Sequence, residues 1–156
     1  MKIGILLCSE GDKMNKKLKI MTDGPMPSYQ TSGSCGIDLY CSNDEDVIIE
    51  PGEMKKINTD LRLEIPEGFF GAVYPRSSTG VKKHLMLANT VGVIDSDYRG
   101  EIMIFMYNYG KSPQAIKKGD RIAQLVIQPY EKCELIKVDN LEETDRGDGG
   151  FGSTGN

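Results

Sequence analysis

Apolar residues along this chain occur in short runs that predict one strand after another, and in Leu18–Met21 and Glu134–Val138 apolar and polar positions alternate with the period of two that is typical of β-strands. Gly, Pro, Asn and Asp, the residues that form turns, separate most of these runs. Only Ser77–Lys83 is predicted to be helical. The predicted strands are Leu18–Met21, Ile37–Tyr40, Val47–Ile49, Met54–Glu64 (as two strands or one bent strand), Phe69–Tyr74, Leu85–Ala88, Val91–Ile94, Ile102–Tyr107, Ile122–Ile127 and Glu134–Val138.

Two of these segments carry a more specific prediction. Ile102–Tyr107 is almost continuously apolar, as expected for a strand that is buried on both faces. Leu85–Ala88 and Val91–Ile94 flank Asn89-Thr90, which indicates a hairpin region. Turn signals recur about every 8–12 residues along the chain, and this spacing is typical of a β-sandwich or jelly roll.

The two ends of the chain differ from this regular part. Residues 146–155 contain five Gly, one Phe and one Arg, and such a segment cannot bury enough apolar surface to order itself. It is either a floppy terminus or a flap that orders over a ligand. The regular pattern begins just after Met14. The sequence therefore predicts an N-terminal extension of uncertain structure (1–13), one β domain (14–140) and a flexible Gly-rich C-terminal arm (141–156).

Length and charge restrict the classes of function. The chain has 156 residues, the size of one ordinary domain. Its net charge is −4 and no Lys/Arg cluster is dense enough for a nucleic-acid footprint, so we expect no nucleic-acid partner. The apolar run Ile3–Cys8 is too short for a signal peptide, and no run is long enough to span a membrane. We expect a cytoplasmic protein (nuclear or in the host cytoplasm if viral) that is not secreted and binds no membrane.

The cysteines indicate neither a metal site nor a redox pair. Cys8, Cys35, Cys41 and Cys133 form no C-x-x-C spacing, and His84 is the only histidine. Reduced, buried thiols in a cytosolic protein are therefore expected.

Three segments carry residues suited to phosphate chemistry. Asp95 and Asp97 share one face of an extended segment, where one carboxylate can activate water while the other tunes it; spacing alone favours a simple acidic hairpin tip. Pro75-Arg76-Ser77-Ser78-Thr79-Gly80 combines a guanidinium, hydroxyls and N–H groups at a helix start, which suits a phosphate cradle or a capped surface turn. Asp38 can hold a hydrated Mg²⁺ or cap a neighbouring loop. Together with the arm, this inventory suits a phosphate substrate, Mg²⁺ and attack by water.

Five segments, in order, resemble the five motifs of the trimeric dUTPases. The resemblance covers the chain from about Leu18 to its C-terminus, and the order and spacing of all five make it far more specific than any one motif. The matching segments are Ser34-Cys35-Gly36-Ile37-Asp38-Leu39-Tyr40, Pro75-Arg76-Ser77-Ser78, Asn89 through Gly100, Gly119-Asp120-Arg121-Ile122-Ala123-Gln124-Leu125, and Arg146 through Gly155.

The resemblance implies a fold and an activity. The expected fold is an all-β, jelly-roll (β-clip-like) subunit with one short helix, assembled as a homotrimer whose active sites lie between subunits. The expected activity is Mg²⁺-dependent hydrolysis of dUTP to dUMP and pyrophosphate by water attack on the α-phosphate. Such an enzyme limits uracil incorporation into DNA and supplies dUMP for dTMP synthesis.

The resemblance also implies residue roles. Asp95 is the expected general base, and Asp38 is expected to hold Mg²⁺ through water. Tyr98 is expected to pack under the deoxyribose and Phe151 to stack on the base. The expected base- and sugar-binding residues are Asn89, Val91, Gly92, Val93, Ile94, Tyr98 and Phe151. The expected phosphate-binding residues are Arg76, Ser77, Ser78, Gln124, Arg146, Gly152, Ser153 and Thr154.

The sequence departs from the family pattern at a few positions. Ser78 stands where the second motif usually has Gly, which bears on how closely the backbone approaches the phosphates. Cys35 and Cys41 stand where the first motif usually has Ala, and both are expected to be buried.

Two other functions remain open on the sequence. A dCTP deaminase shares this fold and a similar Arg-Ser-Ser element, but that family needs a Glu in the strand after the third motif, and Ile102-Met103-Ile104-Phe105-Met106 contains no acid. A catalytically silent, dUTP-binding regulator with a protein partner is the alternative from another class. The intact Asp95 and arm argue against loss of catalysis, while an additional protein partner stays open.

Overall fold

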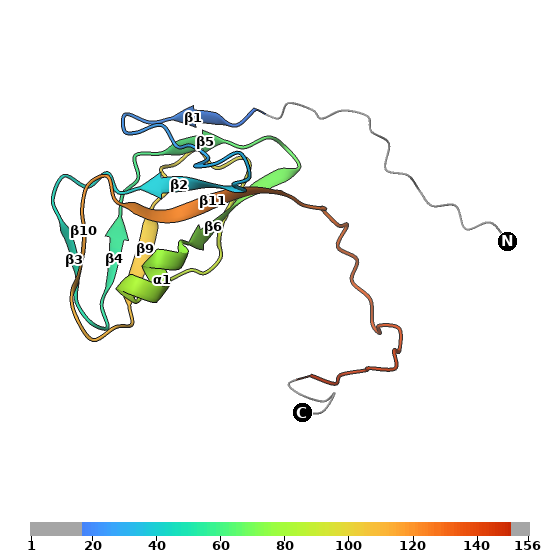
Figure 1. The fold of residues 1–156 in the computed structure, drawn as a ribbon. Coiled ribbons are helices and arrows are strands. Elements are labelled where there is room, and N and C mark those ends of the chain that lie inside the picture. The colour runs from blue at the N-terminus through green and yellow to red at the C-terminus, as the bar shows by residue number, and fades with distance from the viewer. Residues whose placement is uncertain (1–16, 151–156) are drawn as a thin grey trace.

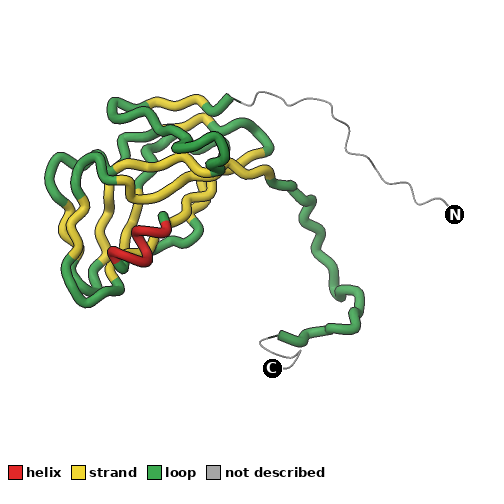
Figure 2. The backbone as a smooth tube through the Cα atoms, in the orientation of Figure 1, coloured by secondary structure: helices red, strands yellow, loops and turns green. Residues whose placement is uncertain are grey.

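Eleven strands and one short helix make up the computed structural model, which describes residues 17–150 (Figure 1). The strands are β1 Lys19–Met21, β2 Gly36–Tyr40, β3 Val47–Ile49, β4 Met54–Ile57, β5 Arg62–Glu64, β6 Phe69–Pro75, β7 Leu85–Leu87, β8 Gly92–Ile94, β9 Ile104–Asn108, β10 Gln114–Ile116 and β11 Arg121–Pro129. The helix, α1, spans Ser77–Lys83, as predicted. In Figure 2 it is the single red segment beside the yellow strands.

The strands form small antiparallel sheets around one core. The largest sheet has the order β2-β11-β6-β8, and a second has the order β4-β9-β7. Strands β1 and β5 form one further pair, and β3 and β10 form another. Side chains of both larger sheets, such as Leu39, Leu125, Ile104 and Met106, belong to one buried cluster. The predicted all-β fold with one short helix is confirmed, and packed antiparallel sheets around one core are the architecture of a jelly roll.

Most predicted turns fall where strands end. The Pro51-Gly52 turn precedes β4 and the Pro66-Glu67-Gly68 turn precedes β6. Gly52 and Gly68 have φ of 77° and 80°, a region that residues with a Cβ rarely adopt. Met54–Glu64 resolves into two strands, β4 and β5, which belong to different sheets.

The predicted hairpin at Asn89-Thr90 is wrong. Strand β7 pairs with β9, whereas β8 pairs with β6 in the other sheet. The connection therefore crosses between sheets, and the Thr90 hydroxyl donates to the Leu87 carbonyl oxygen at 2.8 Å within it. Two short apolar runs separated by a turn predict two strands, but they do not specify which sheet each one joins.

The segment Ile102–Tyr107 was expected to form a strand that is buried on both faces. In the isolated chain this prediction is wrong, because only one face of the strand is buried. Along β9, Ile104, Met106 and Asn108 are buried, while Phe105 and Tyr107 are 36% and 37% exposed. A strand with one buried and one exposed apolar face has the same continuous apolar sequence as a strand buried on both faces.

Residues after β11 form an extended segment that leaves the body of strands (Figure 1). The predicted strand Glu134–Val138 is absent from it: these residues have no strand pairing, and Leu135 is 94% exposed. Alternation alone does not make a strand where no neighbouring strand supplies hydrogen bonds. Strand β10 was not predicted, because only Ala115 and Ile116 are apolar there. No helix in the described range 17–150 is long and apolar enough to cross a membrane.

Candidate active site

Two predicted site residues are brought together by the register of the largest sheet. Asp38 on β2 lies directly opposite Gln124 on β11, so both side chains are on one face. Gln124 in turn pairs with Tyr74 on β6. Arg76 follows Tyr74 by two residues in extended backbone, with φ −81° and ψ 148°, and therefore returns to the same side. Three distant segments of the sequence thus meet at one end of this sheet.

Helix α1 is fixed beside this end of the sheet. The Thr79 hydroxyl donates to the carbonyl oxygen of Ile122 on β11 at 3.4 Å, and the Tyr109 hydroxyl donates to the Gly80 carbonyl oxygen at 2.7 Å. Arg76 is the N-cap of the helix and Ser77 its first residue. The predicted Arg-Ser cradle is therefore the junction of β6 and α1, and its position is set by the core.

A buried carboxylate with two arginines lies at the centre of this group. Asp38 is only 6% exposed. Arg76 donates through Nε to Asp38 Oδ1 at 2.9 Å, and Arg121 donates through Nη1 to Asp38 Oδ2 at 3.2 Å. Because Arg76 uses Nε, its two Nη groups stay available for an anion. Two guanidinium groups and one carboxylate leave one net positive charge, which suits a phosphate.

Asp38 and Arg76 line a cavity of about 340 Å³, which we call the cradle cavity. Its lining comprises Gln30, Gly33, Ser34, Cys35, Gly36, Asp38, Arg76, Ser77 and Gln124. A Cβ on Gly36 would approach Gln124 Oε1 to 3.1 Å, so glycine keeps room for that side chain. Ser78, one residue into α1, is half-buried and is not among the lining residues.

The expected burial of both motif cysteines holds for one of them. Cys41 is 2% exposed, and burial raises the pKa of its thiol. Cys35 is exposed and lines the cradle cavity, so the prediction of its burial is wrong. Cys133, expected to be buried as well, is exposed on the segment after β11. A small residue at position 35 leaves the cavity open, whereas the residue at position 41 fills the core.

A second, larger cavity of about 1130 Å³ contains Asp95, and we call it the Asp95 cavity. Val93 and Asp95 line it together with Phe70, Tyr130 and Leu135. Val93 is 60% exposed and Val91 40% exposed, while Gly92 is buried in strand β8 and Ile94 is half-buried. Asn89 is exposed at the start of this segment. Most of the residues expected to receive the base are thus on β8 or directly beside it.

The loop after β8 is held by its own hydrogen bonds. The Tyr98 N–H donates to the Asp95 carbonyl oxygen at 3.2 Å, and Arg99 Nη1 donates to the carbonyl oxygen of Ser96 at 2.7 Å. The Tyr98 hydroxyl donates to the Glu101 carbonyl oxygen at 3.0 Å, and its ring occupies the space that a side chain on residue 100 would need. Gly100 is therefore required for this position of the Tyr98 ring.

The two cavities lie at opposite ends of strand β6. Ile94 pairs with Gly71, so Asp95 lies near the start of β6, whereas Arg76 follows its last residue, Pro75. Arg76 is five positions beyond Gly71, which corresponds to about 16 Å along a strand. Within one chain, Asp95 and Arg76 therefore cannot flank the same phosphorus atom.

The described part of the arm adds one predicted residue. Arg146 is exposed, and its Nε donates to the Gly149 carbonyl oxygen at 2.8 Å within a turn. Arg146 thus joins neither cavity. The remaining predicted arm residues, Phe151, Gly152, Ser153 and Thr154, lie outside the described residues, as does the N-terminal extension 1–13.

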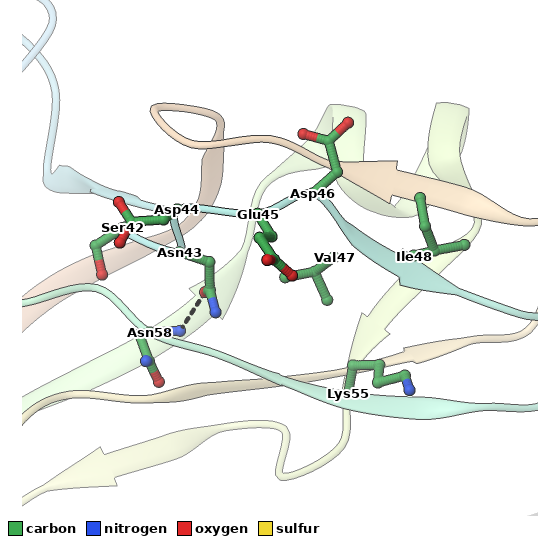
Figure 3. A pocket seen from close by; sticks show the side chains of 9 residues that line it. All are labelled: Ser42, Asn43, Asp44, Glu45, Asp46, Val47, Ile48, Lys55 and Asn58. Carbon is green, nitrogen blue, oxygen red and sulfur yellow. Dashed lines mark hydrogen bonds between the residues drawn. The ribbon is translucent and has the colours of Figure 1, made fainter.

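A third cavity, of about 730 Å³, has the wrong charge for a phosphate. It is lined by Ser42–Ile48, Lys55 and Asn58. Figure 3 shows the carboxylates of Asp44, Glu45 and Asp46 pointing in different directions around it. Lys118 forms a 2.6 Å ion pair with Asp44 and lowers the pKa of that carboxyl. Three acids at one opening repel an anion, so this cavity is not the candidate site.

The donor set at the cradle cavity fits a magnesium ion that arrives with a phosphate ligand. Among residues 17–150, no group of three or more His, Cys, Asp or Glu side chains is placed to hold a metal ion alone. Asp38 is the single carboxylate of the cradle cavity. Mg²⁺ commonly keeps several waters and is held by one or two carboxylates plus substrate phosphates. Asp38 can therefore accept hydrogen bonds from metal-bound water, but it cannot form a cage.

Sequence comparisons identify relatives over most of the chain. The family model described as dUTPase matches residues 22–155. A deoxyuridine 5'-triphosphate nucleotidohydrolase of Desulfitobacterium hafniense is 51% identical over 131 residues, covering 83% of this chain and 87% of the relative. One of Finegoldia magna is 45% identical over 141 residues, covering 89% and 99%.

Solved structures with the same fold agree with this result. The dUTPase of Staphylococcus bacteriophage 80alpha with dUPNHPP is 30% identical, has a TM-score of 0.81 and covers 89% of this chain and 98% of its own. Phage dUTPases of this kind are described as controlling the transfer of virulence genes. A variant dUTPase of phage phi11 of S. aureus, solved for its coordination of a structural Mg(II) ion, is 27% identical with a TM-score of 0.74, covering 82% and 100%. From the family match over residues 22–155 and these relatives, the chain belongs to the dUTPase family.

Proposed function

We propose that this protein hydrolyses dUTP to dUMP and pyrophosphate, with Mg²⁺, by attack of water on the α-phosphate. The observation that carries the proposal is the cradle cavity of a dUTPase-family chain, where Asp38, Arg76, Ser77 and Gln124 meet although they come from three separate motifs. A cavity lined by one arginine and one carboxylate, with Arg121 paired to that carboxylate from outside the lining, suits a triphosphate with its cation.

The cradle cavity binds the phosphates. The free Nη groups of Arg76, the Ser77 hydroxyl and the Gln124 side chain face a common space, and Ser78, the second residue of α1, is adjacent. Asp38 would hold Mg²⁺ through water, and the ion would supply charge neutralisation on the phosphate oxygens when bound. Fixed donors at these oxygens stabilise the charge that develops on them as water attacks.

Strand β8 and the loop that follows bind the nucleoside and supply the base. Asp95 accepts the proton of the attacking water, which contributes typically about 10²–10⁴-fold in rate. Backbone groups from Asn89 to Ile94 match the donor and acceptor edge of uracil and leave the cytosine amine unpaired, which discriminates strongly. The ring of Tyr98, kept in place by Gly100, packs under the sugar and excludes a ribose hydroxyl.

The arm closes the site. Arg146, Gly152, Ser153 and Thr154 bind the γ-phosphate, and Phe151 stacks on the uracil. Closure excludes bulk water, which strengthens every electrostatic interaction inside. The exposed position of Arg146 in the isolated chain supports this role, because its guanidinium is bonded only within its own turn and is free to engage a ligand.

The active sites are completed by neighbouring subunits of a homotrimer. The separation of about 16 Å between the Asp95 end and the Arg76 end of β6 requires a second copy to bring Asp95 to the cradle cavity. A second observation is the outward face of the β4-β9-β7 sheet. Met54, Tyr107 and Met86 are in register across its three strands and are 53%, 37% and 43% exposed, beside Phe105. Such a face is typical of a subunit interface.

Substituting this face tests the trimer. Phe105→Glu places a carboxylate on the outward side of β9, and we expect the variant to elute as a monomer with at least about 100-fold lower turnover, because a buried unpaired charge is strongly unfavourable. Size-exclusion chromatography with light scattering gives the mass. Met21→Glu is the matched control, since Met21 is 60% exposed on β1 away from this sheet. A Phe105→Glu variant that remains a trimer would place the interface elsewhere.

The function is tested by pyrophosphate release from dUTP, dCTP, dTTP and UTP, each with Mg²⁺ and with EDTA. We expect rapid release from dUTP alone, lost with EDTA. Release of ammonia from dCTP would instead indicate the deaminase, which the acid-free strand β9 argues against. Tight dUTP binding without cleavage would support the dUTP-binding regulator. Gene-transfer control is described for a phage relative at 30% identity, whereas relatives at 45–51% identity are named nucleotidohydrolases, and we therefore place the enzyme first.

A further inference from the structure

Arg121 has a position that the motif pattern alone does not explain. It is the first residue of β11 and pairs with Tyr40, while Ala123 pairs with Leu39, so β11 has one extra residue, Ile122, against β2. Such a bulge locally re-aims the side chains beside it. Here the bulged strand lets Arg121 reach Asp38, which is itself opposite Gln124.

The contact with Arg121 gives the second oxygen of the buried Asp38 carboxylate a charged hydrogen-bond donor. Asp38 Oδ1 accepts from Arg76 Nε, and Oδ2 accepts from Arg121 Nη1. The Asp38 side chain is 8% exposed and that of Arg121 is 43% exposed. A buried carboxylate that loses one of its charged partners is strongly disfavoured, and its side chain then rotates or recruits water.

Arg121 acts from outside the cradle cavity. It is absent from the residues that line this cavity, whereas Asp38, Arg76 and Gln124 all belong to them. Any effect of Arg121 on a bound phosphate must therefore pass through Asp38, which holds the Nε of Arg76 and so sets the direction of its two Nη groups.

We propose that Arg121 is a positioning residue of the cradle cavity: it fixes the Asp38 carboxylate, and Asp38 in turn orients Arg76 towards the phosphates. The inference rests on the proposed function only for the choice of ligand, a triphosphate bound in the cradle cavity. A misplacement of a substrate-orienting group by about 1 Å can cost about 10²-fold in rate.

The test is a double-mutant cycle between Arg121→Gln and Asp38→Asn, measured on the full-length trimer. The readout is calorimetric affinity for a non-hydrolysable dUTP analogue and for tripolyphosphate, each with Mg²⁺. We expect Arg121→Gln alone to weaken both by roughly 10-fold or more, since charge-assisted hydrogen bonds are the strong ones. In the Asp38→Asn background, Arg121→Gln should lower the affinity by less than about twofold. The two effects are not additive, because Arg121 acts on the ligand through Asp38.

Two further variants separate positioning from general stability. Arg121→Lys keeps one cation near Asp38 and should recover part of the affinity. Lys117→Gln removes the same charge four residues earlier, where the side chain is 69% exposed and 3.9 Å from Asp46, and should leave the affinity unchanged. Thermal unfolding should show that all variants remain folded.

A readout without ligand comes from NMR of the arginine side chains. The Nε–H resonance of Arg76 should carry the signature of its bond to Asp38 and should shift in Arg121→Gln but not in Lys117→Gln. An unshifted resonance with unchanged affinity would overturn the proposal. The proposal would also be overturned if the two substitutions lowered the affinity independently, so that the double variant lost the product of the two single losses. Arg121 would then act on the nucleotide without Asp38. A wild-type protein that binds but does not cleave dUTP would refute the proposed function while leaving this test intact.

Discussion

Asp95→Asn should bind a dUTP analogue with nearly wild-type affinity and lose turnover by about 10²–10⁴-fold. Asparagine keeps the shape of the side chain but cannot accept the proton of the attacking water. Asp95 is exposed in the Asp95 cavity, and substitutions of exposed residues usually change the free energy of unfolding by less than about 0.5 kcal/mol. Pyrophosphate release at saturating dUTP measures the loss, and calorimetry with the analogue measures binding.

Glu67→Gln is the matched control for this experiment. Glu67 is exposed in the turn before β6 and lines the same cavity, so the substitution removes an equal charge from the same surroundings. It should retain turnover within about threefold, as surface substitutions away from special features do. Retained turnover in Asp95→Asn would remove Asp95 from the role of general base.

Truncation after Thr144 should reduce kcat/KM by at least about 10²-fold, the effect typical of removing even one donor to a developing charge. The truncation deletes Arg146 and the glycine-rich segment that follows. Within the described residues every strand lies before residue 130, and residues 145–148 are exposed, so these residues contribute nothing to the core. The proposed trimer should therefore remain intact by light scattering while pyrophosphate release collapses.

Arg146→Gln in the full-length chain separates the guanidinium from the rest of the arm. We expect Arg146→Gln to lower kcat/KM less than the truncation does, mainly through a higher KM. The rest of the arm is still present and can close over the base. A truncated trimer that stays fully active would show that the arm is a floppy terminus, which is the other interpretation that its composition allows.

Local sequence signals predicted local structure well. The Pro-Gly and Glu-Gly turns and the helix Ser77–Lys83 appear where expected, because turn residues and caps act within a few positions of the chain. The errors concern partners that are distant in sequence. Glu134–Val138 alternates but has no strand beside it, and Leu85–Leu87 joins β9 rather than β8. Pairing of this kind is decided by the whole fold.

The candidate site shows the same division. The motif pattern selected Asp38, Arg76 and Gln124, and the strand register brings them together. The motif pattern assigned no role to Arg121. The bulge at Ile122 depends on how β11 pairs with β2, and the sequence of one strand alone does not reveal it. The pattern also placed Cys35 in the core, as alternation with the buried Ile37 and Leu39 would suggest, but residue 35 lies before β2 begins at Gly36 and lines the cavity instead.

The opposite ends of strand β6 have a consequence for how much activity a cell obtains from this chain. On the proposed mechanism a newly made copy is inert, since its Asp95 and its cradle cavity serve different sites. Output then depends on encounters between copies, so it rises more steeply than the number of chains when they are scarce and becomes proportional once assembly is complete. Dilution alone is enough to switch off such an enzyme, with no inhibitor and no change in any single molecule.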